Sequence, residues 1–546
     1  MLYTLLSTII IIPTLLGMGS IFERIIGKAW TGISAKLFSG TVLLSLFWTV
    51  AAFFFPINIY IELISVATGI STFFYFKQNL RLIDFIKENS KAFFPILLVI
   101  IFFGAFYPFI LDHFGYYIPT IKWISEVGLV KGISNLDLLL GQSSVWHIFQ
   151  AGFSNFSDPF LRINSVILII YLIYILEKKS WMHLGFLPIL FLFSPSPSPD
   201  LPVIVFSLMI LNEILKGNKN ISLLFAFSVF VFIIKPTVIW LPVFTLLYAL
   251  LILKSNLKFL IGGSLIFILF LIKNIWTFGF PIFPVQFFDL GLNWAPNKEL
   301  LKISSEIAIE KTFDMQYTAA EIKNFSTSDY LINWFSIEGI KSKIHIAFAL
   351  ALIVFSVFTF IKKKKIITIL LISVLIKSLI LLFFSAQYRF LIDVFFVVAF
   401  VVFFEMISRK TSLLIFISIS IVCGIFLAFP KFIQPHFPSF RLGNYMMGFE
   451  KTQFIKPSYF KLEKYQSYDL GNLKLNVVEG YPFSFDIQIP AVSPGYIQEY
   501  IDAGIVPQKI GSDLKDGFIW RKATPEELEQ MKTAFENNRN SIPYSK

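Results

Sequence analysis

Residues 366–384 read IITILLISVLIKSLILLFF, and four consecutive lysines, residues 362–365, come directly before them. An α-helix needs roughly 20 mainly apolar residues to cross the hydrocarbon core of a bilayer. Lysine and arginine gather at the cytoplasmic ends of such helices. The stretch therefore predicts a membrane-spanning helix whose first residues lie at the cytoplasmic face.

Apolar stretches of the same kind occupy most of the chain. Hydrophobic residues make up 56% of the sequence and charged residues only 15%, against about 25% in an ordinary soluble protein. We predict an all-α polytopic transmembrane bundle of about 14 helices, with a range of 12–14 because several stretches are short. The segment 181–253 contains prolines that favour a bent or re-entrant path. The predicted spans are residues 2–21, 37–55, 58–76, 92–111, 162–176, 181–194, 201–215, 221–234, 237–253, 257–276, 344–361, 366–384, 390–407 and 412–430.

Basic residues between these stretches give the predicted orientation. Every second connection is basic, which is the pattern of cytoplasmic turns. The N-terminus and the C-terminal segment then both lie outside. The net charge of +12 comes from these short clusters, so it predicts no nucleic-acid partner. The basic turns contain Arg24, Lys28 and Lys36; Lys77, Arg81, Lys87 and Lys91; Lys178 and Lys179; Lys216 and Lys219; Lys254 and Lys258; residues 362–365; and Arg409 and Lys410.

Two domains follow from this pattern. Residues 1–430 form the transmembrane domain, and its outer loops 111–161 and 277–343 are too long for simple turns. Residues 431–546 gain charges, Pro and Gly, which predicts a small α+β extracytoplasmic domain.

Local patterns support this prediction for the tail. Residues 473–478 and 485–489 are strand-like. Thr524-Pro525-Glu526-Glu527 predicts a helix start, with a capping Thr, a Pro at the first position and acids in the first turn.

Four basic residues lie at predicted membrane depth on the outer side, against the general charge pattern: Lys235, Lys273, Lys377 and Arg389. Ionisable groups at this depth are costly and are functional by default. One interpretation is a shared site for an anionic headgroup, such as a lipid phosphate or pyrophosphate from the outer leaflet. The alternatives are snorkelling of Lys235 and Lys273 to the interface, and a helix cap for Arg389.

The first outer loop opens with Leu111-Asp112-His113-Phe114-Gly115-Tyr116-Tyr117 directly after a predicted span. A carboxylate there could act as a general base, if a partly desolvated site held it near a hydroxyl nucleophile. The alternative is an interfacial Asp112 that pairs with Lys122 or with a cation of the cluster. The five His residues are scattered and predict no metal site.

Several short motifs resemble those of a bacterial family of multi-pass membrane proteins that is similar to the GT-C superfamily of glycosyltransferases. The motifs follow a shared order over most of the chain. They are residues 112–124 with Glu126, Gly128, Gly132, Asn135 and Leu136, and residues 141–147, 194–200, 235–236, 273–274, 279–284, 387–390 and 513–518.

The resemblance implies a GT-C-like fold and a donor in which a polyprenyl phosphate carries the sugar or glycan. Enzymes of that superfamily place a catalytic Asp or Glu in the first outer loop, and Asp112 occupies this position. Their basic residues near the donor phosphate correspond by role to the four cations named above. Some of these families have a second acid beside the first, but here His113 follows Asp112. We therefore expect no metal, and no cofactor besides the lipid-linked donor.

Further residues are predicted to line the substrate site. Tyr117 could instead belong to an aromatic belt, and Trp146 and His147 to an interfacial helix with a Trp anchor. Asp200 could simply be a solvated residue of an outer turn. The predicted lining residues are His113, Tyr117, Lys122, Trp146, His147, Asp200 and Asn274.

We expect a membrane glycosyltransferase that moves a sugar from a polyprenyl-phosphate donor to a glycan, lipid or protein acceptor on the outer face of a bacterial inner membrane. Asp112 as general base would give inversion at the anomeric carbon. The alternatives are a flippase or transporter for a lipid-linked glycan, a glycan polymerase or ligase of another membrane fold, and a non-catalytic assembly factor whose tail binds a partner. A transporter would show paired repeats with broken helices, and the sequence shows no clear repeat.

Overall fold

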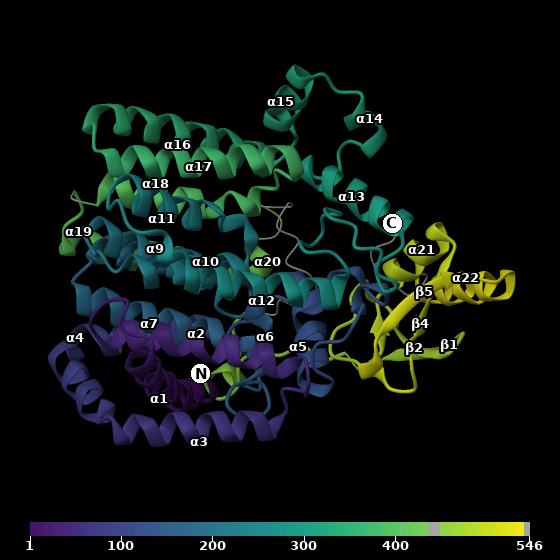
Figure 1. Cartoon of the computed structure of the whole chain (residues 1–546), viewed down its shortest axis with the longest axis horizontal. Helices are drawn as coiled ribbons and strands as arrows, with labels where there is room; N and C mark the ends of the chain where they lie inside the picture. The colour runs from purple at the N-terminus through teal and green to yellow at the C-terminus, as the bar shows by residue number, and fades with distance from the viewer. Residues whose placement is uncertain (405, 434, 436–447, 463, 540–546) are drawn as a thin grey trace.

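In the computed structural model, the chain forms a stack of roughly parallel helices with a small strand-containing part at one end (Figure 1). The structure describes all residues except 405, 434, 436–447, 463 and 540–546. In the described part, 6 helices are long and apolar enough to cross a membrane. They are α1 (Leu2–Ile25), α2 (Ile33–Ala52), α12 (Leu260–Phe278, preceded by the 3-10 turn η7, Leu257–Phe259), α16 (Ile340–Lys362), α17 (Lys365–Phe384) and α19 (Arg409–Ala428). The prediction of a helical membrane protein is confirmed at this level.

The remaining predicted spans fall on a bent pair and on shorter helices. α3 (Ile59–Tyr75) and α4 (Gln78–Gly104) meet at a bend of 75°, and only together are they long and apolar enough to cross a membrane. If this bent pair is one span, the number of candidate spans rises to 7. The longest of the others have 16 residues, and at about 1.5 Å per residue they are shorter than a hydrocarbon core of about 30 Å. The count of fourteen therefore stays a prediction. The shorter helices are α7 (Ile163–Lys178), α8 (Leu187–Leu190) between the turns η4 (Trp181–Phe186) and η5 (Phe191–Phe193), α9 (Asp200–Leu215), α10 (Ile221–Ile234), α11 (Trp240–Leu251) after η6 (Pro236–Val238), and α18 (Ile392–Phe403).

One predicted basic turn is wrong. Residues 77–91 are expected to connect two spans, but Gln78 already begins α4. Lys77 has a left-handed backbone with a φ of 53°, and the chain bends there. Asp84 stands three residues before Lys87, a spacing that stabilises an exposed helix. The charged segment is therefore the first half of α4.

Glycines let α1 and α2 cross with their backbones in contact. A Cβ added to Gly19 would lie 1.8 Å from the carbonyl oxygen of Lys36, and one added to Gly40 would lie 2.1 Å from the carbonyl oxygen of Leu15. Small residues at such crossings are how helices approach closely within a membrane.

The two long segments that are predicted as outer loops, residues 111–161 and 277–343, both contain helical structure, as their length suggests. In Figure 1, α5 and α13–α15 lie toward the same end of the stack as the strands. The first loop contains the π-helical turn η1 (His113–Tyr117), α5 (Ile118–Glu126), the 3-10 turns η2 (Ile133–Asn135) and η3 (Leu138–Gln142), and α6 (Val145–Ala151); the second contains α13 (Lys298–Thr312), α14 (Ala319–Lys323) and α15 (Thr327–Ser336).

The tail contains two small sheets, so strands and helices are both present, as predicted. In the first, β1 (Tyr465–Leu470) pairs antiparallel with β2 (Leu473–Val478), and β2 pairs in parallel with β3 (Ala491–Val492). In the second, β4 (Ile505–Lys509) pairs antiparallel with β5 (Phe518–Lys522). Parts of the predicted domain 431–546 lie outside the described residues. The other elements beyond α19 are α20 (Pro430–Ile433), η9 (Lys451–Phe454), α21 (Pro494–Ala503), η10 (Leu514–Asp516) and α22 (Pro525–Arg539).

Two of the three local predictions for the tail are confirmed. Residues 473–478 form β2. The Glu527 backbone N–H donates to Thr524 Oγ1 at 3.3 Å, and the Thr524 N–H donates to the Glu527 carboxylate at 2.9 Å, which starts α22 as predicted. The strand at 485–489 is wrong, because Phe485 lies in a turn with a φ of 50°.

The tail shares its hydrophobic core with the first outer loop. Trp123 and Leu136 of the loop belong to the same buried cluster as Tyr500 and Phe518 of the tail. The Tyr500 hydroxyl donates to the carbonyl oxygen of Leu136. The Phe518 N–H donates to the carbonyl oxygen of Lys131 at 2.9 Å. The described part of the tail is therefore joined to the loop in which Asp112 lies.

Candidate functional site

Asp112 and Arg389 form an ion pair between elements that are distant in sequence. Asp112 lies directly before η1, and Arg389 is the middle residue of the 3-10 turn η8 (Tyr388–Phe390) between α17 and α18. Arg389 Nη1 lies 2.6 Å from Asp112 Oδ2, and the side chains are 39% and 40% exposed. Asp112 is interpreted above either as a general base or as an acid that pairs with a cation of the cluster. The structure shows the contact that the second interpretation requires.

A second ion pair lies beside the first. Lys235 directly follows α10, Asp200 begins α9, and their mostly buried side chains pair with each other. Lys235 Nζ lies 5.1 Å from the centroid of the Phe390 ring, and Arg389 Cζ lies 5.0 Å from the same centroid. Both distances are within the range of cation–π attraction. The two ion pairs are therefore neighbours that share one aromatic ring.

A third ion pair is buried between helices. Lys377 of α17 pairs with Asp393 of α18, and their side chains are 0% and 8% exposed. The Trp240 indole N–H donates to the other carboxylate oxygen of Asp393 at 2.8 Å. Removing one partner of such a pair leaves an uncompensated buried charge. Asp393 therefore holds Lys377 and the start of α11 together.

Lys273 has different partners from the other three cations. Its fully buried amino group donates to the carbonyl oxygens of Gln142 at 2.6 Å and Ser143 at 3.1 Å. In the ranges that the structure describes, it forms no ion pair with a carboxylate. Lys273 therefore fixes the end of η3 in the first outer loop.

These contacts change the picture of the predicted anion site. Arg389, Lys235 and Lys377 each already have one carboxylate partner. An anion could reach one of them only by displacing or joining a carboxylate. Exchange is least costly at Arg389, because its pair is partly hydrated, whereas the Lys377 pair is shielded from water.

Two predicted lining residues make contacts with backbone carbonyls. Lys122 Nζ donates to the carbonyl oxygen of Asp486 at 2.6 Å. Asn274 Nδ2 donates to the carbonyl oxygen of Pro281 at 2.8 Å. Lys122 thus joins the first outer loop to the tail, and Asn274 fixes the chain after α12.

The aromatic predicted lining residues are buried. Trp146 is 0% exposed and donates to Asn164 Oδ1 at 3.2 Å, so the interpretation as an interfacial Trp anchor is wrong. The Tyr117 ring contacts the His147 ring at a tilt of 36°, with 4.8 Å between the ring centroids. Burial raises the pKa of Tyr117 well above its usual value, and the charges of Asp112 and Asp200 raise it further. Tyr117 is therefore a neutral phenol near the carboxylates of Asp112 and Asp200.

The two histidines of this region are neutral at pH 7. Burial lowers the pKa of His147 to about 3, and burial also lowers the pKa of His113 well below its usual value. His113 Nδ1 shares a hydrogen bond with Ser196 Oγ at 3.0 Å. Within the described residues, no group of three His, Cys, Asp or Glu side chains is placed to hold a metal ion.

Sequence reasoning missed several buried charged residues, and two of them lie close to the elements of the site. Asp393 lies in the apolar run of α18, and Arg162 lies at the start of a predicted span. Arg162 donates to the carbonyl oxygens of Gly104 at 2.9 Å and Ser458 at 2.6 Å, which ties the end of α4 to the tail. Both positions carry the signal that led to the four cations, an ionisable group at membrane depth.

Two acids at the contact between loop and tail give a testable pH dependence. Burial raises the pKa of Asp137 to about 7 against the effect of a hydrogen bond with Tyr496. Burial, with the nearby charge of Asp137, raises the pKa of Glu499 to about 7. Each pKa is higher than in an unfolded chain, so their contribution to stability is present at low pH and is lost as pH rises toward about 7.

We expect Asp137→Asn to flatten this dependence. The melting temperature of the purified full-length protein should fall between about pH 5 and pH 8 in the wild type, and it should fall clearly less in the variant. The exposed Asp289 is the matched control, and Asp289→Asn should keep the wild-type slope. Equal slopes for all three proteins would contradict the assignment of Asp137.

The apolar helices indicate a polytopic α-helical membrane protein, and three ion pairs form a charged site toward one end of its bundle. The chain belongs to the family described as Domain of unknown function (DUF8201), which matches residues 1–396. Comparison with curated proteins and with solved structures finds no match. All three ion pairs lie within the matched residues, and the tail lies beyond them.

Proposed function

We propose that the protein is a GT-C-type glycosyltransferase of a bacterial inner membrane, with about 14 helices and with both termini outside. A polyprenyl-phosphate-linked sugar would be its donor, and a glycan, lipid or protein its acceptor. The observation that carries the proposal is the half-exposed Asp112–Arg389 pair. A carboxylate suited to act as a base and a guanidinium suited to bind phosphate are in direct contact there.

The pair suggests how donor binding prepares the site. In the free protein, Arg389 neutralises Asp112. A phosphodiester carries one negative charge, as a carboxylate does, and it can accept two parallel hydrogen bonds from the planar guanidinium. It can therefore replace Asp112 as the partner of Arg389. When Arg389 turns to the donor phosphate, the Asp112 carboxylate is released from its ion pair and is free to accept a proton. Lys235, on the same Phe390 ring, supplies a second positive charge.

Sugar transfer would proceed by direct displacement at the anomeric carbon. The acceptor hydroxyl oxygen attacks the anomeric carbon, and Asp112 takes the hydroxyl proton. The bond between the anomeric carbon and the phosphate oxygen breaks, and its electron pair stays on the departing polyprenyl phosphate. Arg389 and Lys235 stabilise the charge that develops on this leaving group. Attack from the face opposite the leaving group inverts the anomeric carbon.

We expect Arg389→Gln to weaken binding of polyprenyl phosphate by about tenfold or more, because a charge-assisted hydrogen bond is lost. The measurement is a titration of the full-length protein in nanodiscs with polyprenyl phosphate, and with polyprenol to test dependence on the phosphate. Arg521 is the matched control, because it also pairs with a carboxylate and its side chain is 41% exposed. Arg521→Gln should bind like the wild type. Equal binding of phosphate and alcohol would overturn the proposed donor.

A transporter of a lipid-linked glycan is the second candidate. The observation in its favour is the Lys377–Asp393 pair, because intramembrane ion pairs often mark transport pathways. Asp112→Asn separates the two functions. A transporter should keep moving fluorescent lipid-linked glycan across proteoliposomes, whereas a glycosyltransferase should lose its product.

A further inference from the structure

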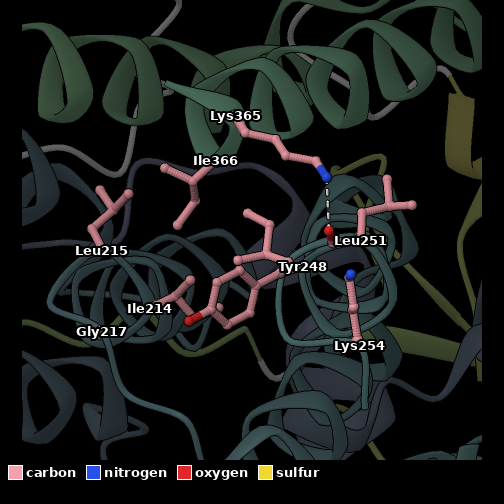
Figure 2. A pocket seen from close by; sticks show the side chains of 9 residues that line it. Ile214, Leu215, Gly217, Tyr248, Leu251, Lys254, Lys365 and Ile366 are labelled. Atoms are coloured by element: carbon pink, nitrogen blue, oxygen red, sulfur yellow. Dashed lines mark hydrogen bonds between the residues drawn. The ribbon is translucent and has the colours of Figure 1, made fainter. Parts of the chain in front are cut away.

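A pocket of about 530 Å³ opens at the end of the bundle opposite the ion pairs. α9 begins at Asp200 and α11 begins at Trp240, both at the charged site, and both helices end at the pocket. α17 starts there at Lys365. The pocket therefore lies where three helix ends meet, on the side of the basic turns (Figure 2).

Two lysines line the pocket, and no acidic residue does. Lys365 Nζ donates to the carbonyl oxygen of Leu251 at 2.8 Å. An ammonium group has three donors, so this contact leaves two for another partner. Lys254 is exposed, and Figure 2 shows its amino group on the same side of the pocket as that of Lys365. Among the residues that the structure describes, neither lysine forms an ion pair.

The surroundings add further positive charge. The basic turns that contain Lys216 and residues 362–364 adjoin the pocket in sequence. α17 begins at Lys365 without a side-chain cap, so the partial positive charge of its N-terminus is also exposed there. The hydrogen bond from Lys365 to the end of α11 could by itself account for the position of Lys365. It does not account for Lys254, which lies beside it and forms no ion pair among the described residues.

The other walls of the pocket are apolar. Ile214, Leu215 and Ile366 line it, and Leu251 is 46% exposed at its edge. A free phosphate would need no such walls. Apolar side chains beneath two amino groups instead match the boundary between a lipid headgroup and its acyl chains.

We propose that this pocket binds an anionic phospholipid of the cytoplasmic leaflet. Its phosphate would lie between Lys254 and Lys365, and its acyl chains would follow Leu251 and Ile366 toward the bilayer centre. The inference uses the proposed orientation of the protein but not its proposed activity. It would hold equally for a transporter.

The test is a titration of the full-length protein in detergent micelles with palmitoyl-oleoyl-phosphatidylglycerol, with bound lipid counted by native mass spectrometry. K254Q/K365Q should bind the lipid about tenfold or more weakly, because it removes both ammonium groups that would contact the lipid phosphate. K254R/K365R keeps both charges and should bind like the wild type. The matched control is K219Q/K258Q, which removes two exposed lysines of neighbouring basic turns outside the pocket.

Each outcome decides the proposal. Loss confined to K254Q/K365Q, with unchanged melting temperature and elution volume, supports a lipid site at the pocket. Equal loss in K219Q/K258Q would mean general surface attraction and would overturn it. Equal affinity for the zwitterionic phosphatidylcholine, or full competition by inorganic phosphate, would overturn it as well. A pocket variant that does not fold is replaced by K254Q alone, because Lys254 makes no ion pair among the described residues.

Discussion

Asp112→Asn is expected to slow sugar transfer by about 10²- to 10⁴-fold, the usual contribution of a positioned general base. The amide keeps the shape of the side chain and can still accept a hydrogen bond from Arg389, but it cannot take a proton from the acceptor hydroxyl. The measurement is the initial rate of polyprenyl phosphate release in membranes that contain the native donor pool.

Two comparisons separate this role from a structural one. Asp289→Asn removes an exposed outer-loop acid whose side chain is 51% exposed, and it should transfer at the wild-type rate. Asp112→Asn should bind polyprenyl phosphate at least as well as the wild type, because Arg389 loses a competing partner. Transfer at the wild-type rate in Asp112→Asn would show that Asp112 is not the base. Loss of donor binding together with transfer would show that the pair only supports the fold.

Asp393→Leu is expected to destabilise the protein by about 3–5 kcal/mol, because Lys377 is left as a buried, unpaired charge. The measurement is the free energy of unfolding in mixed micelles, or the melting temperature where unfolding is irreversible. The matched control is the Lys341–Asp314 pair, whose side chains are 26% and 33% exposed. Asp314 has a left-handed backbone with a φ of 57°, which Asn also tolerates, so Asp314→Asn should cost only about 0–1 kcal/mol.

A double variant shows whether the charge itself is the cause. Lys377→Met with Asp393→Leu removes both charges and should recover most of the lost stability. The Trp240 indole N–H would still lack its acceptor, so recovery should be incomplete. A double variant as unstable as Asp393→Leu would mean that the packing, rather than the ion pair, holds α17 to α18.

The sequence shows at which positions a charged side chain is costly to bury, but it does not show which residues these side chains contact. Lys377 and Arg389 stand out because lipid penalises charge wherever the chain folds. The partner of Arg389 is 277 residues away in sequence, and no periodicity connects two such positions. Lys273 shows the same limit, since its buried charge is matched by backbone carbonyls that no composition reveals.

The helix count was hard to predict for a related reason. Hydropathy shows that a segment is apolar, but it does not show whether lipid or other helices surround it. α10 is almost entirely buried within the protein, whereas only 22% of the most apolar stretch of α16 is buried. Both read as spans in the sequence. The bend of 75° between α3 and α4 depends on a left-handed Lys77, which has no strong sequence signal.

The shared core of tail and outer loop has a consequence for biogenesis. Tyr500 and Leu136 are joined by a hydrogen bond and are 364 residues apart in the chain. During synthesis, the apolar face around Trp123 and Leu136 must therefore wait until the residues around Tyr500 have been made. Exposed apolar surface in such an intermediate is prone to aggregation. The nascent protein is then vulnerable until that segment is made, and a chaperone that shields residues 118–142 would raise its yield.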